Sequence, residues 1–494
     1  MAPSLARSVL VLSDLGALRG ALASLRRCGR FDHLVTHPAN GHMQGGEGGR
    51  ARTRRAPSPS PPTQIALNSL WLLLARVGTQ ALSLVFTIAV ARGLGQAGLG
   101  QYALIAAVIF LGNVLTTFGM DTLLLREIGR SRRTGSPMMA AGLWLQLILS
   151  ALLVGSLLIG VGFLPGKTQE TQLALKIAAF SLFPLAFYTI FSAALRAFER
   201  MDLFLLLNLA AGFMQTCGAW LVLRAGGGVL GLAVLLLVSQ TLMAILAGML
   251  CTRRLPGFSF PWSASREGLL AALRLGWRFA LLAWLGVLAQ RVGLVLLSFL
   301  AGDGATGQFA AAARVVEALK TGHYAILGAL FPALSRLQYD EQHLGGAVRR
   351  KAIENASRRA FLPLLVLSFM LALIMTFLAG PLTAFLFGAD FAASAPALEA
   401  LIWILLPYTV SAVISLDLVT AGRETVVVLA LAISLSLTAA LLAFLVPRMG
   451  VLGACVASIF GESAQAALLF LLSRRDESGG PQRGELPQPT GEGP

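Results

Sequence analysis

Polar side chains interrupt several long apolar runs of this sequence, at spacings that place them on one face of a helix. Arg76 and Gln80 are four residues apart, and Ser83 and Thr87 continue the same face. Arg291 lies near the middle of another apolar run. Because guanidinium groups bind phosphate in a planar, bidentate manner, these residues could hold an anionic group in a polar cavity. The alternative is a set of hydrogen bonds between neighbouring helices.

A third run carries Arg314, Glu317 and Lys320 at intervals of three residues. Charges at this spacing lie on one helix face, where they could bind a substrate or neutralise one another as a structural ladder. The sequence leaves both interpretations open. The residues that we expect to bind a substrate head group are Arg76, Gln80, Arg291, Arg314 and Lys320.

Four carboxylates are candidates for coupling or gating, namely Glu462, Glu317, Glu399 and Asp121. An ionisable group inside a membrane is costly, so it usually faces a partner or a hydrated cavity. Glu462 lies near the middle of the last apolar run, where it could bind a coupling ion, H⁺ or Na⁺. A buried salt bridge with Arg291 or Arg76 would explain it equally well. Glu399 lies near a helix end and could instead anchor its helix at the membrane interface.

These residues belong to a chain of 494 residues that is 56% hydrophobic and only 13% charged, which excludes an ordinary water-soluble fold. Its apolar runs are long enough to cross a membrane as helices, which need about 20 residues each. We predict an all-α integral membrane protein with about twelve transmembrane helices. They lie near 66–91, 100–119, 138–164, 173–195, 203–223, 229–251, 276–301, 308–334, 361–387, 396–421, 425–446 and 451–472.

Composition and two internal repeats divide the chain. The stretch at 45–62 is mostly Gly, Arg, Ser and Pro and cannot bury a core. GQAGLGQYA at 95–103 matches GDGATGQFA at 302–310, and GVLGLAV at 228–234 matches GVLGACV at 450–456. The offsets are 207 and 222 residues, and the second aligns Gln240 with Glu462. Both matches keep the same side of the membrane, so the halves are related by a pseudo-two-fold axis along the membrane normal.

The predicted organisation follows from these boundaries. It is a disordered basic tail at 1–63, a six-helix bundle at 64–252, a cytoplasmic linker at 253–274, a second six-helix bundle at 275–473 and a disordered tail at 474–494.

The distribution of positive charge along the chain predicts how the protein is oriented in the membrane. The net charge of +16 comes largely from the N-terminal tail and from joints that contain residues such as Arg126, Arg130, Arg253 and Arg254. Lys and Arg gather in cytoplasmic loops, so we expect both termini in the cytoplasm and the protein in the cytoplasmic (inner) membrane. We therefore expect no nucleic-acid partner.

The sequence lacks the residue patterns of a histidine metal site, a Cys-x-x-Cys pair and a phosphate loop. The body of the chain has too few histidines for a histidine metal site, and no Cys-x-x-Cys pair occurs. Gly166-Lys167-Thr168 looks like the end of a phosphate loop, but Val161 stands where its first glycine belongs. We expect no metal and no cofactor.

Two segments of the first half carry a family resemblance. The residues from Ala91 to Tyr102, followed by GMDTLLLREIGR at 119–130, resemble polysaccharide-exporting flippases of lipid-linked oligosaccharides. FGADFAASAPAL at 387–398 agrees with this in the second half. The resemblance extends to multidrug and toxin extrusion transporters and the lipid II flippase. Family members often have an acidic residue beside the basic one in the seventh helix, whereas Arg291 here is flanked by Gln290 and Val292.

The resemblance implies two six-helix bundles around a central cavity and alternating access. The substrate implied is an undecaprenyl-diphosphate-linked oligosaccharide for exopolysaccharide or lipopolysaccharide. The partners implied are that substrate, membrane lipid, and a polysaccharide polymerase with its export machinery. We expect a monomeric transporter and no enzyme. Alternatives are a cation-coupled multidrug exporter of the same superfamily and, less favoured, a membrane polysaccharide polymerase or ligase. Such an enzyme would need a larger outer loop than the joint at 165–172.

Overall fold

The apolar runs fold as helices, since the backbone groups of a membrane span must form their hydrogen bonds within the segment. The computed structural model describes residues 61–130, 135–163, 166–255, 258, 260–340, 346–420 and 423–475, and no strand occurs in these ranges. The predicted tails therefore lie almost wholly outside the described residues. The described residues form one compact unit.

In the first half, the described residues form seven α-helices and a short 3₁₀ helix. They are α3 (Pro61–Thr117), α4 (Met120–Arg130), α5 (Gly135–Gly160), η2 (Val161–Phe163), α6 (Gln169–Ala179), α7 (Leu182–Ala197), α8 (Met201–Arg224) and α9 (Gly228–Arg254).

In the second half, the described residues form seven further α-helices and two 3₁₀ helices. They are α10 (Arg266–Leu300), α11 (Gly302–Asp340), α12 (Gly346–Phe387), η4 (Ala389–Ser394), α13 (Ala395–Leu401), η5 (Ile402–Ile404), α14 (Leu405–Thr420), α15 (Glu424–Met449) and α16 (Val451–Arg475).

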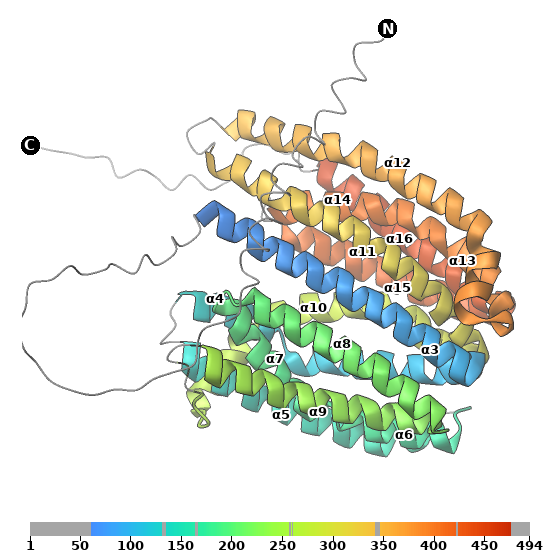
Figure 1. Ribbon diagram of the computed structural model, residues 1–494. Coiled ribbons are helices and arrows are strands. Elements are labelled where there is room, and N and C mark those ends of the chain that lie inside the picture. The colour runs from blue at the N-terminus through green and yellow to red at the C-terminus, as the bar shows by residue number, and fades with distance from the viewer. Residues whose placement is uncertain are drawn as a thin grey trace, which may run out of the picture. The chain divides into compact units, whose positions relative to one another are not determined.

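Ten stretches of the described residues are long and apolar enough to span a membrane. The first covers 47 residues because α3 contains a non-helical residue, Gly95, with φ 69° and ψ −169°, where the chain turns back. Helix α11 is charged, yet it runs between the same two ends of the assembly (Figure 1). Division of α3 at Gly95 and inclusion of α11 give about twelve membrane crossings, which confirms the predicted fold class. We call the two ends the Gly95 end and the Arg475 end.

The two halves contact each other reciprocally at the Gly95 end. A Cβ atom on Gly100 of α3 would collide with the backbone carbonyl of Asp303 in α11, and one on Gly307 would collide with that of Gln96. An offset of 207 residues relates Gly100 to Gly307 and Gln96 to Asp303. An exchange of the two halves therefore maps this contact onto itself, as a two-fold axis requires. Only glycine lets the two backbones approach so closely.

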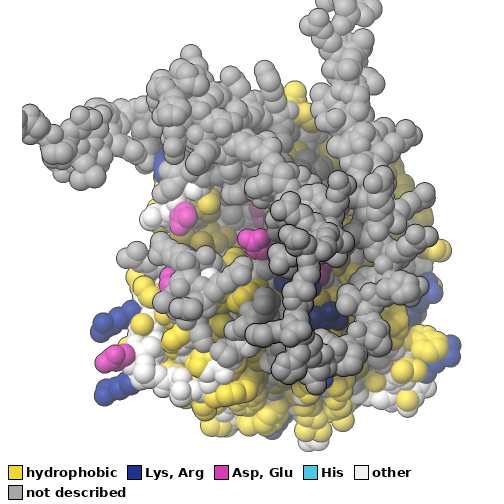
Figure 2. Space-filling model, turned by 60° about the vertical axis from the view of Figure 1, so that its left-hand side comes forward, with side chains coloured by type: hydrophobic (Ala, Val, Ile, Leu, Met, Phe, Trp, Pro, Cys, Tyr) yellow, Lys and Arg dark blue, Asp and Glu magenta, His cyan; other side chains and the backbone are white. Residues whose placement is uncertain are grey.

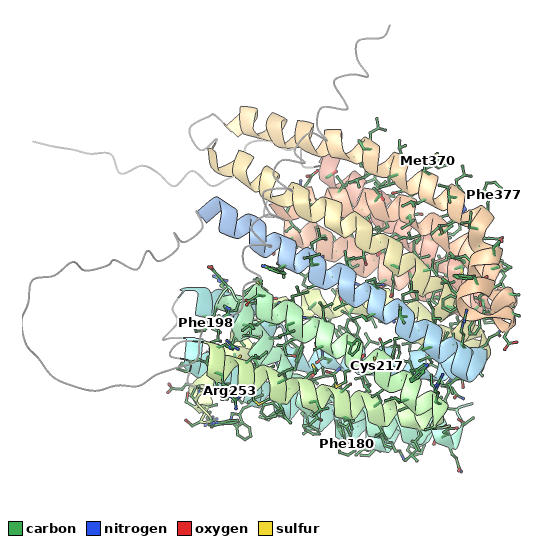
Figure 3. All side chains as sticks on the ribbon, viewed as in Figure 1. Phe180, Phe198, Cys217, Arg253, Met370 and Phe377 are labelled. Atoms are coloured by element: carbon green, nitrogen blue, oxygen red, sulfur yellow. The ribbon has the colours of Figure 1, made fainter. Side chains whose placement is uncertain are left out.

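Hydrophobic side chains cover much of the outer surface, as expected for helices that face lipid. Met370 and Phe377 of α12 project away from the helices (Figure 3), and the Phe377 side chain is 77% exposed. The described part of the surface seen in Figure 2 is largely hydrophobic, with some Lys and Arg at its left and right margins.

The observed helices are divided differently from the expected runs at three places, and α10, α11 and α12 also begin before the runs expected there. Helix α4 was not predicted, since its charges resemble a loop, but it is amphipathic and buries Leu123, Leu124 and Ile128. The fourth span is two helices, α6 and α7, with the break at Phe180–Ser181. The tenth span begins as the short helices α13 and η5 before α14. The apolar composition is continuous across these breaks, so periodicity did not indicate them.

Candidate functional site

A cavity of about 910 Å³ lies among α10, α11 and α13 to α16, with the first leg of α3 along one side. We call it the C-terminal cavity. It brings together seven of the nine residues that the sequence singled out. They are Arg76, Gln80, Arg291, Arg314, Glu317, Lys320 and Glu462.

Glu317 connects two of the arginines. Its Oε1 lies 3.2 Å from Nη1 of Arg291 on α10, and its Oε2 lies 2.9 Å from Nη1 of Arg314 on its own helix. Arg314 also donates from Nε to the hydroxyl of Thr87 in α3, at 3.1 Å. All three charged side chains remain between 23% and 33% exposed. The Arg314–Glu317 ion pair that the ladder interpretation predicts is thus present. Arg291 joins it, and all three side chains remain partly exposed to the cavity.

This arrangement explains the absence of an acidic neighbour beside Arg291 in the sequence. Its carboxylate partner comes from the adjacent helix rather than from its own. The Arg291 guanidinium also lies over the ring of Phe110, 5.1 Å from the ring centre.

The other side of the cavity is formed by α14 and α16. The ammonium of Lys320 lies 4.4 Å from the ring centre of Tyr408. Glu462 accepts a hydrogen bond of 2.6 Å from the hydroxyl of Ser411. Sequence analysis missed Tyr408 and Ser411, and the signal that could have found them is their polarity inside a membrane span.

Gln80 is half-exposed as a residue, but its amide nitrogen is buried and has no hydrogen-bond partner among the described residues. It lines the cavity one helical turn from Arg76. A buried donor without a partner is costly, so a ligand or water that accepts its hydrogen bond would be stabilised there.

Two predicted residues lie elsewhere. Glu399 is an exposed residue of α13, near the Gly95 end. Asp121 lies in the first turn of α4 at the opposite end, with Oδ1 at 3.4 Å from the hydroxyl of Thr122. Neither lines the C-terminal cavity.

A second cavity, of about 360 Å³, lies among the helices of the first half, and we call it the N-terminal cavity. Its lining mixes polar and apolar side chains and is mostly neutral, and Arg314 belongs to the linings of both cavities. Each cavity is lined mainly by one half, but Arg76 and Gln80 of the first half reach the C-terminal cavity.

Polar contacts join the halves at the Gly95 end. Lys167, from the loop before α6, forms a 2.5 Å ion pair with Asp303 and donates to the carbonyl and hydroxyl of Ser298 at 2.7 and 2.6 Å. Arg92 donates to the carbonyl oxygens of Phe385 and Leu386 in α12. The next residue of the suspected phosphate loop, Thr168, caps α6 through the backbone N–H of Thr171.

The chain resembles known proteins in sequence and in fold. A family described as "Polysaccharide biosynthesis protein" matches residues 65–338, more than half of the chain. Among curated proteins, no sequence matches the chain.

Solved structures share the fold at low sequence identity. An inward-facing multidrug resistance MATE family transporter of the MOP superfamily has a TM-score of 0.67 at 16% identity, covering 83% of this chain and all of that one. A MOP superfamily transporter from Pyrococcus furiosus has a TM-score of 0.61 at 17% identity, covering 85% and 96%. An outward-facing MATE transporter has a TM-score of 0.56 at 18% identity, covering 85% and 96%. Family and fold together point to a transporter rather than an enzyme.

Proposed function

The chain belongs to the polysaccharide biosynthesis protein family, and we propose that it is a flippase for a lipid-linked oligosaccharide. In this proposal the protein holds the diphosphate-sugar head group in its cavities and carries it across the cytoplasmic membrane by alternating access. The lipid tail stays in the membrane beside the helices.

The charge balance of the C-terminal cavity is the observation that carries this proposal. Four cationic side chains face two carboxylates there, so the lining has an excess of positive charge. The cations are Arg76, Arg291, Arg314 and Lys320, and the carboxylates are Glu317 and Glu462. A diphosphate that links a lipid to a sugar carries a negative charge on each phosphate, which complements this excess.

The ion pairs of Glu317 prepare the arginines for a phosphate. Glu317 holds the guanidinium groups of Arg291 and Arg314 on either side of one carboxylate. Each guanidinium has further N–H donors and is partly exposed, so a phosphate oxygen can bind beside the carboxylate or replace it. Because the groups are already oriented, little conformational entropy is lost when the head group binds.

A multidrug exporter that takes organic cations is the alternative. The carboxylates Glu317 and Glu462 and the ring of Tyr408 are groups that could attract such a cation. However, Glu317 is engaged by two arginines, and the net charge of the lining would repel a cation. The Pyrococcus furiosus transporter is described as having a binding pocket of reverse polarity that suggests a different function for that protein. We therefore favour the anionic substrate.

Transport in proteoliposomes tests the proposal. The full-length protein should flip a fluorescent undecaprenyl-diphosphate oligosaccharide and should leave an ethidium-like cation where it is. Arg76→Ala and Arg291→Ala should abolish flipping while the protein remains in the membrane. Arg448→Ala is the matched control, since Arg448 is exposed at the Gly95 end of α15 and lines neither cavity. Full activity of both cavity variants, or transport of the cation alone, would contradict the proposal.

A further inference from the structure

The N-terminal cavity has the lining of a binding site for a neutral, hydroxyl-rich ligand. Side-chain amides of Asn113, Asn208 and Gln240 reach it from three helices, beside the aromatic rings of Phe86 and Tyr102. Its volume of about 360 Å³ falls within the range of about 300–1,000 Å³ that is usual for small-molecule sites.

The two cavities are counterparts in the two halves of the chain. The offset of 207 residues relates Tyr102, Phe110 and Asn113 of the N-terminal cavity to Phe309, Glu317 and Lys320 of the C-terminal cavity. The offset of 222 residues relates Gln240 to Glu462, which also line the respective cavities.

Charge is what distinguishes the counterparts. An aromatic ring in the first half is replaced by Glu317, and two amides are replaced by Lys320 and Glu462. Among the residues that line the N-terminal cavity in the described part of the chain, Arg314 is the one with a charge. Equivalent positions thus offer neutral hydrogen-bonding groups in one half and ionic groups in the other.

We propose that the N-terminal cavity is the glycan subsite of the transporter, and that it binds the sugar residue next to the diphosphate. The inference rests on the proposed function. A sugar presents hydroxyls that both donate and accept hydrogen bonds, and an amide side chain offers both a donor and an acceptor. The C–H face of the sugar ring is apolar and packs on an aromatic ring.

Two of the amides are free for this role. The Asn208 amide donates to the carbonyl of Phe204, one turn earlier in its own helix, at 2.7 Å. No side-chain hydrogen bond is described for the half-buried Asn113 and Gln240, within the part of the chain that the structure covers. Their donors and acceptors can therefore bind a ligand without the loss of an internal bond.

The N-terminal cavity adjoins the cationic C-terminal cavity, as the bond between a sugar and a diphosphate requires. In the substrate, the first sugar is bonded directly to a phosphate, so its site must adjoin the cationic cavity. Arg314 lines both cavities. Arg291 of the C-terminal cavity lies over Phe110, whose ring lines the N-terminal one. The guanidinium groups of Arg291 and Arg314 thus lie at the boundary, where the phosphate attached to the sugar would be.

Binding of two ligands to the detergent-solubilised full-length protein tests the subsite. One ligand is undecaprenyl diphosphate, and the other is undecaprenyl diphosphate that bears a neutral oligosaccharide. Asn113→Leu and Gln240→Met should each weaken binding of the glycan ligand about tenfold, since each removes one to two hydrogen bonds. Binding of undecaprenyl diphosphate alone should not change. Gln101→Leu is the matched control, because Gln101 lies on the same leg of α3 and lines neither cavity.

The outcomes separate the two proposals. Equal weakening of both ligands, or no weakening of either, overturns the glycan subsite while the flippase proposal stands. A wild-type protein that binds neither ligand overturns the flippase proposal itself. A thermal melt of each variant shows whether it is folded, and Arg291→Ala should weaken both ligands together.

Discussion

The Lys167–Asp303 ion pair should hold the Gly95 end closed, and its removal should open that end. The two side chains are only 2% and 13% exposed, and the pair joins the loop before α6 in the first half to α11 in the second. In Lys167→Met, the carboxylate of Asp303 loses its ammonium partner while it is still buried. Opening of the Gly95 end would hydrate that carboxylate, so the substitution penalises the closed form more than the open one.

The size of the effect follows from the burial. Removal of one partner from a buried pair costs about 3–5 kcal/mol, and about 1.4 kcal/mol corresponds to a factor of ten. Lys167→Met should therefore raise the ratio of open to closed protein by about 100-fold or more. Asp303→Asn should have a smaller effect, because Lys167 keeps the carbonyl and the hydroxyl of Ser298 as acceptors.

A cysteine at position 99 reports the opening. Leu99 is 2% exposed and packs in the core that both halves share near the Gly95 end. In a background without the native cysteines, Leu99→Cys should react slowly with a membrane-impermeant maleimide. Addition of Lys167→Met should accelerate the reaction by the same factor as the population shift. The rate is measured in intact cells and in proteoliposomes, so that both sides of the membrane are sampled.

Control variants decide between opening and general damage. Asp202→Asn breaks the Arg200–Asp202 ion pair, whose side chains are 37% and 48% exposed, and should leave the rate unchanged. The double variant Lys167→Asp with Asp303→Lys should restore slow labelling. The reasoning is refuted if Lys167→Met labels as slowly as its parent, or if Asp303→Asn labels faster than Lys167→Met.

Three further predictions concern single positions. Gly100→Ala should lower the melting temperature in detergent, because its methyl group would meet the facing carbonyl of α11 and overpacking costs about 1–3 kcal/mol. Gly155→Ala, whose added carbon would meet no atom within 4 Å beyond its own stretch of helix, should melt at or above the wild-type temperature, and equal melting of both variants would contradict this. Glu462→Gln should make proteoliposome transport insensitive to an imposed pH gradient, whereas retained sensitivity would exclude Glu462 as the coupling group. Mass spectrometry after treatment with a membrane-permeant maleimide should find Cys217 modified and Cys251 intact, since Cys217 is exposed and Cys251 buried, and the reverse pattern would refute this burial.

Hydrophobicity and length are enough to predict most of the crossings, but the count of about twelve also needs the charged helix α11 and the division of α3 at Gly95. Each span must satisfy its own backbone, so its existence is a local property of the sequence. Breaks within a span are not local in this sense. The turn at Gly95 was expected as a loop, but a single non-helical residue separates the two helical legs of α3. The break at Phe180–Ser181 lies inside a continuous apolar run, and its one sequence signal is Pro184 in the first turn of α7.

Prediction of the site succeeded for residues that share a helix and was incomplete across helices. The common face of Arg76 and Gln80 follows from helical spacing. The pairing of Arg291 with Glu317 depends on how α10 packs against α11, which the spacing does not contain. Glu399 is a carboxylate in an apolar run, as Glu462 is, yet the short helix α13 places it outside the C-terminal cavity.

The reciprocal contact of Gly100 and Gly307 has the form of an isologous interface, in which two partners offer the same patch to each other. Such an interface ordinarily assembles two separate copies, at a concentration that their affinity sets. Here the polypeptide between α9 and α10 joins the two copies, and each glycine is covered by the backbone of the other half. Both partners of this interface therefore belong to one chain, so the pairing of the halves is independent of how much protein the membrane contains.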